Sequence, residues 1–100
     1  MLSDIPKSLE KVSGEDLDKE ILRVGMIAEL DAVSLYEQLA AMTENEDIKK
    51  VLLDIAKEEK THTGEFEELL KRVDGEYSGE LEAGKKEVEE MIDAEKEEVA

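Results

Sequence analysis

Residues 48–73 read IKKVLLDIAKEEKTHTGEFEELLKRV, and this stretch decides the fold. Its apolar residues recur in alternating steps of four and three, the spacing that places side chains on one narrow face of an α-helix. The positions on this stripe are Ile48, Leu52, Ile55, Glu59, His62, Phe66, Leu69 and Val73. Six of these eight positions are apolar, so we expect the stripe to pack against another helix.

Glu59 and His62 are the two polar exceptions, and they are neighbours on the stripe. They form a Glu-x-x-His motif, in which the carboxylate and the imidazole lie one turn apart on the same helix face. A carboxylate in an apolar stripe costs on the order of several kcal/mol unless its charge is compensated. Two interpretations are open: the pair binds a metal ion, or the two side chains are hydrogen-bonded at a helix interface.

The composition favours one small, all-α domain. The chain has 100 residues, only 3% of them aromatic, and its apolar residues suit packed helices better than sheets. It has no cysteine, which excludes disulfides and thiolate metal sites. The net charge of -16 disfavours nucleic acid and anionic membranes as partners. With no secretory signal and no apolar run near the roughly 18 residues of a membrane span, we expect a soluble, cytoplasmic protein.

The chain divides into an arm, a hairpin and a C-terminal helix. Residues 1–14 hold the single proline and no sustained apolar pattern, which indicates a mobile or loosely docked arm. Residues 15–74 are expected to form an antiparallel two-helix hairpin, because the polar turn 43–47 separates two long helical patterns. Residues 75–100 combine strongly acidic composition with a thin apolar strip, so we expect a helix that packs between subunits.

The first helix of the hairpin is more apolar than one partner helix can cover. We expect it to begin after Ser13, its N-cap, and to end near Thr43, with Gly25 as a weak interruption. Its central stripe is Leu22, Met26, Glu29, Val33, Tyr36 and Ala40, and two further apolar stripes lie beside it. Since so short a chain offers few other elements to cover them, we expect it to oligomerise.

Glu29 is expected to lie opposite Glu59 and His62. Position 45 lies within the expected turn, and Glu29 stands 16 residues before it while His62 stands 17 residues after it. In an antiparallel hairpin, residues equally far from the turn face each other. The resulting set of two carboxylates and one imidazole suits Fe, Mn or Zn. Di-metal carboxylate bundles use a Glu from each of two helices and Glu-x-x-His from each of two others. Because His62 is the only histidine, such a site requires two chains related by a twofold axis.

Residues around this set have more than one interpretation. Tyr36 lies two turns after Glu29 and either hydrogen-bonds a ligand or donates an electron, or it simply packs at the edge of the stripe. Asp31 could bind a cation in transit or form a salt bridge. Glu58 and Glu65 flank the site and are expected to be solvated.

The segments ELDAVSLY (residues 29–36) and EEKTH (residues 58–62) resemble the encapsulated ferritins, two-helix ferritin-like proteins housed inside encapsulin nanocompartments. The likeness covers about residues 20–75. It implies a homodimer that forms a ferritin-like four-helix bundle, and a ring-shaped decamer of such dimers. It also implies that Glu29, Glu59 and His62 are the catalytic ligands of a di-iron site between subunits, with Tyr36 beside them.

The resemblance further implies a ferroxidase that oxidises Fe2+ with O2 and feeds mineralisation inside an encapsulin shell in the cytoplasm. Of the family's acidic entrance site, Asp31 is matched, whereas Ala28 and Leu35 replace an acid and an aromatic residue. The family's short apolar cargo-loading peptide is not matched at residues 97–100, so the sequence is expected to be truncated or fused to its shell protein.

Two other functions remain open from the sequence. The first is a non-enzymatic helical assembly module in which Glu59 and His62 pair with partners and fix the register of packed helices. The second is a rubrerythrin-like peroxidase, which the absence of a cysteine-rich iron site disfavours.

Overall fold

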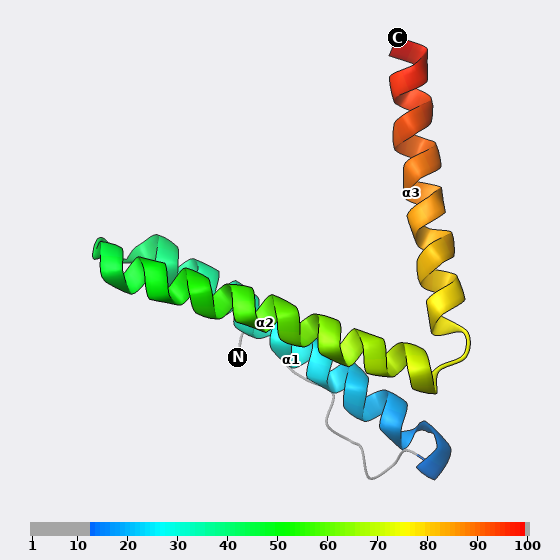
Figure 1. Cartoon of the computed structure of the whole chain (residues 1–100), viewed down its shortest axis with the longest axis horizontal. Coiled ribbons are helices and arrows are strands. Elements are labelled where there is room, and N and C mark those ends of the chain that lie inside the picture. Colours follow the sequence, from blue (N-terminus) through cyan, green and yellow to red (C-terminus); the bar gives the residue numbers. More distant parts are fainter. Residues whose placement is uncertain (1–12, 100) are drawn as a thin grey trace.

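The computed structural model describes residues 13–99, apart from the side chains of Glu15 and of residues 94–99. Three helices follow one another along the chain (Figure 1): α1 (Gly14–Met42), α2 (Glu46–Val73) and α3 (Tyr77–Val99). No strand occurs within residues 13–99, so the predicted all-α class is confirmed. Residues 1–12 of the predicted arm lie outside the described residues, and Gly14 already belongs to α1.

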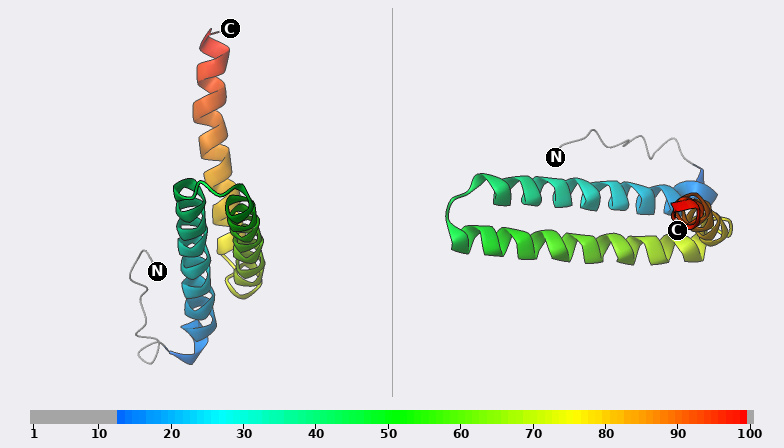
Figure 2. Two further views of the ribbon diagram at one scale, coloured as in Figure 1. Left: turned by 90° about the vertical axis from the view of Figure 1, so that its left-hand side faces the viewer. Right: turned by 90° about the horizontal axis from the view of Figure 1, so that it is seen from above.

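α1 and α2 form the predicted antiparallel hairpin and lie side by side along nearly their whole length (Figure 2). The turn is stabilised by Asn45, the N-cap of α2, whose side-chain oxygen accepts hydrogen bonds from the N–H groups of Asp47 (3.0 Å) and Ile48 (3.1 Å). The Thr43 hydroxyl in turn accepts a hydrogen bond from the Asn45 N–H at 3.2 Å. A side-chain cap of this kind contributes about 1 kcal/mol and fixes where α2 begins.

The start of α1 differs in detail from the sequence expectation, and the end of α2 is stabilised by a side chain. Ser13 occupies the N-cap position of α1, but its hydroxyl donates to the Asp16 carboxylate at 3.3 Å and caps no backbone N–H. α2 ends at Val73, and its C-cap residue, Asp74, is extended. The Asp74 carboxylate accepts from the Glu76 N–H at 3.1 Å and lies 3.4 Å from Arg23 Nη2 on α1. The Asp74 carboxylate therefore stabilises the short connection between α2 and α3.

The core of the hairpin is narrow. Among the described residues the fully buried apolar side chains are Ala40, Ala56 and Leu70. The predicted stripe of α2 is not buried as a unit, because Leu69 remains 50% exposed and Val73 43% exposed. A straight α-helix drifts by about 20° per heptad relative to a 3.5-residue repeat, so a long stripe rotates away from a single partner. One edge of the stripe therefore faces outward in the single chain.

α3 projects away from the hairpin, with which it shares only the corner at its start (Figure 1). Its apolar strip stays open, since Val88, Met91 and Ile92 are 50%, 62% and 47% exposed. The packing of this helix between subunits stays a prediction. Within the part of the chain that the structure describes, no helix is both long enough and apolar enough to cross a membrane.

Candidate metal centre

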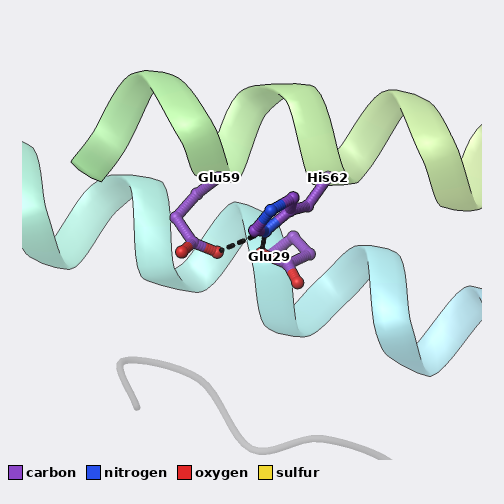
Figure 3. A group of neighbouring side chains, drawn as sticks. All are labelled: Glu29, Glu59 and His62. Carbon is purple, nitrogen blue, oxygen red and sulfur yellow. Dashed lines mark ion pairs between the residues drawn. The ribbon is translucent and has the colours of Figure 1, made fainter. Parts of the chain in front are cut away.

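The three predicted ligands meet near the middle of the hairpin (Figure 3). Glu29 comes from α1, while Glu59 and His62 come from α2, one turn apart on the same face. One ligand atom from each residue lies within 4.8 Å of the other two. Counting residues from the turn therefore placed Glu29 at the correct level opposite the Glu-x-x-His motif.

His62 lies between the two carboxylates. Its Nδ1 atom is 3.5 Å from Glu29 Oε2 and 3.5 Å from Glu59 Oε2. Glu29 Oε2 is itself buried and has no hydrogen-bond partner. Leaving a carboxylate oxygen buried without a hydrogen bond is unfavourable, and a bound cation would stabilise it. Two hard oxygen donors and one imidazole nitrogen fit a divalent ion such as Fe2+, Mn2+ or Zn2+.

The site also binds protons more tightly than isolated side chains do. The Glu59 carboxyl, which can share a hydrogen bond with Glu29, raises the pKa of Glu29. Partial burial and the charge of Glu59 also raise this pKa, and together these effects outweigh His62, which lowers it. Partial burial lowers the pKa of His62, but the charges of Glu29 and Glu59 outweigh this effect and raise it overall. A cation that binds here competes with protons for these side chains.

Tyr36 and Asp31 border a cavity of about 330 Å³ beside the ligands. Its lining residues are Ala28, Glu29, Asp31, Ala32, Leu35, Tyr36 and Glu59. The cavity thus connects the predicted entrance residue Asp31 with two of the predicted ligands. Glu58 and Glu65 are exposed, as expected, although the charge of Glu65 contributes to the raised pKa of His62.

One feature near the site was missed in the sequence. Gly25 of α1 faces the ring of Phe66 of α2, and a Cβ atom at position 25 would lie 2.8 Å from Phe66 Cε1. Glycine inside a helix costs about 0.5–1 kcal/mol relative to alanine, so its presence in the middle of α1 was the available indication of a close approach.

Comparison with known proteins gives the family. Residues 20–99 match the family described as Rubrerythrin. The crystal structure of an encapsulated ferritin domain from Pyrococcus furiosus is similar with a TM-score of 0.76 and 47% identity, covering 90% of this chain and 94% of that chain. The chain therefore belongs to the rubrerythrin family of ferritin-like proteins. The close match over nearly all of that solved domain places it among the encapsulated ferritins, as the sequence resemblance indicated.

Two curated relatives are longer than the aligned region. One, also from Pyrococcus furiosus, is described as a ferritin-like-encapsulin shell fusion protein and is 54% identical over 72 residues. The other, from Myxococcus xanthus, is described as an encapsulin nanocompartment cargo protein and is 38% identical over 68 residues. The alignments span 72% and 68% of this chain but only 21% and 52% of the relatives.

Proposed function

We propose that the chain is a ferroxidase, which oxidises Fe2+ to Fe3+ with O2 at a di-iron site completed by a second copy of the chain. The observation that carries this proposal is the convergence of Glu29, Glu59 and His62, together with the buried Oε2 atom of Glu29, which accepts no hydrogen bond and lies 3.5 Å from Nδ1 of His62. An apolar helix interface that only needed to pack would gain nothing from this atom.

The chemistry of the three side chains supports iron as the substrate. Carboxylates are hard, anionic ligands, and they stabilise Fe3+ more than Fe2+, which favours loss of an electron from the bound ion. Nδ1 of His62 faces both carboxylates and can bind once the imidazole has lost its proton. The Tyr36 phenol borders the adjoining cavity, where it can hydrogen-bond a ligand or supply an electron, and Asp31 can attract incoming Fe2+.

A second copy supplies what one chain lacks. A di-metal site of this type uses two Glu-x-x-His motifs, and this chain has a single histidine. His62 is 44% exposed at the open edge of the α2 stripe, where Ile48 and Leu69 are each 50% exposed. A second hairpin packed on this edge would bury these apolar side chains and bring its own ligands to the site. We extend the proposal to the decameric ring that the family resemblance implies.

We also propose an encapsulin shell as the partner, in the cytoplasm. Both curated relatives carry encapsulin in their descriptions, one as a shell fusion and one as a cargo protein. The described residues form a helical hairpin with one projecting helix (Figure 2), and we propose that the Fe3+ produced is stored in another container. A surrounding shell provides that container.

Addition of Fe2+ under anaerobic conditions, followed by exposure to air, tests the ferroxidase proposal. We expect ferric absorbance to rise with O2 consumption, faster than in a protein-free control. A helical assembly module would give neither signal above that control and would overturn the proposal. If H2O2 were consumed rapidly while O2 was not, a peroxidase would be favoured.

A further inference from the structure

Gly25 and Phe66 meet one helical turn from the metal centre. Gly25 precedes Glu29 by four residues on α1, and Phe66 follows His62 by four residues on α2. We propose that this contact sets the spacing between α1 and α2 at the level of the metal centre, which makes Gly25 a positioning residue for Glu29. The inference rests on the metal-binding role proposed above for Glu29, Glu59 and His62.

The contact leaves no room for a side chain at position 25. A Cβ atom there would lie 2.8 Å from Cε1, 2.9 Å from Cζ and 3.0 Å from Cδ1 of Phe66. Non-bonded carbon atoms normally stay about 3.5–4.0 Å apart. The three close approaches involve one edge of a rigid ring, so the ring must turn away as a whole or the two helices must separate.

Other glycines of the described chain do not have this role. A Cβ atom would meet nothing within 4 Å at Gly14, Gly64, Gly75, Gly79 or Gly84. Gly64 is the most informative of these, because it lies inside α2, two residues from His62, and is exposed. The absence of a side chain is therefore required by packing at position 25 and not at position 64.

A change in helix spacing would affect one ligand differently from the other two. Glu59 and His62 share α2 and would keep their mutual geometry, whereas Glu29 comes from α1 and would move relative to both. Ligand sets must be held to within about 0.5 Å of the productive geometry. A Cβ atom 2.8 Å from the ring lies about 0.7 Å inside the ~3.5 Å contact distance, and a displacement of α1 by that amount would take Glu29 out of the productive range.

The test uses Zn2+ as a redox-inert probe, with binding to the full chain measured by calorimetry at constant pH. We expect Gly25→Ala to weaken Zn2+ binding by about tenfold, the size of effect seen when groups that orient ligands are lost. Adding Phe66→Leu to Gly25→Ala removes the conflicting ring and should restore affinity to within about threefold of the unchanged chain. Gly64→Ala, the matched control, should bind as the unchanged chain does.

Melting of the metal-free chain provides a second measurement. Alanine is a better helix former than glycine, so Gly25→Ala should raise the melting temperature by about 3 °C when Phe66 is already leucine. With Phe66 present, the same substitution should lower it. This reversal of sign identifies the steric conflict without any metal.

The outcomes distinguish a failure of the positioning role of Gly25 from a failure of the metal site itself. Zn2+ affinity unchanged in Gly25→Ala, or weakened without recovery in the double variant, would overturn the positioning role while leaving the metal site in place. If the unchanged chain took up no Zn2+ and no Fe2+, the metal site itself would be wrong, and the positioning role would be refuted with it.

Discussion

The hairpin and α3 are both built from amphipathic helices, but the hairpin buries apolar side chains that the corresponding face of α3 leaves exposed. In the hairpin, α1 and α2 bury Ala40, Ala56 and Leu70 between them and hold three ligand side chains together. α3 exposes Val88, Met91 and Ile92, and it contacts the hairpin only near its start (Figure 1). The comparison indicates that one chain is sufficient to bring Glu29, Glu59 and His62 together, whereas the proposed di-metal site and the packing of α3 would both require other chains.

The largest effect should be a change in oligomeric state when a chelator removes metal ions from the chain. Bringing four carboxylates together at a twofold axis is unfavourable until cations neutralise them. We expect native mass spectrometry to show monomer or dimer for metal-stripped chain, and larger species after Fe2+ is added. Assemblies of the same size with and without chelator would show that the apolar surfaces alone drive association.

The next largest effect should be a difference in unfolding free energy between truncating a buried side chain of the hairpin and truncating an exposed side chain of α3. Leu70→Ala opens a cavity in the hairpin core and should cost about 2–5 kcal/mol of unfolding free energy. Ile92→Ala on α3 removes a side chain that is 47% exposed and should cost less than about 0.5 kcal/mol in dilute, metal-free chain. Urea denaturation measures both. Equal losses would mean that α3 is packed as tightly as the hairpin.

A smaller effect is expected from pH, because two ionisable side chains of the hairpin have raised pKa values. The folded chain raises the pKa of His62 above 6.5 and that of Glu29 above 4.5. Folding is therefore favoured while these groups are protonated, and their contributions are lost as pH rises through the raised values. The melting temperature of metal-free chain should fall as pH increases from 5 to 8, by less than Leu70→Ala lowers it.

Substitution isolates the source of this pH dependence. Glu29→Gln should reduce the slope, because it removes one of the two carboxylates that face His62. Glu58→Gln is the matched control, since Glu58 is exposed and lies outside the group. A slope of the same size in Glu29→Gln would place its origin elsewhere in this acidic chain. Metal uptake should show the opposite trend and strengthen as pH rises.

The hairpin could be predicted because its determinants are local and periodic. Apolar spacing and the polar turn defined both helices, and counting from that turn paired Glu29 with His62. These inferences need only the rise and period of an α-helix. The candidate ligands could be selected because polar residues inside an apolar stripe are unusual, and their role as ligands stays a prediction.

The parts that could not be predicted depend on three-dimensional contacts. Which edge of the α2 stripe faces α1 depends on helix drift, so the exposure of Leu69 beside the buried Leu70 was not foreseen. The direction of α3 depends on the corner at Asp74, where a carboxylate meets Arg23 from another helix. The role of Gly25 depends on the position of one aromatic ring.

The most direct test of the central claim compares iron oxidation in Glu59→Ala and Glu58→Ala. The two substitutions remove the same charge from adjacent residues, but only Glu59 belongs to the proposed metal-binding group. Initial rates of Fe2+ oxidation by O2 should fall towards the protein-free rate in Glu59→Ala, because a twofold site loses two ligands at once. Glu58→Ala should oxidise Fe2+ as the unchanged chain does. Full ferroxidase activity in Glu59→Ala would contradict the assignment of this site.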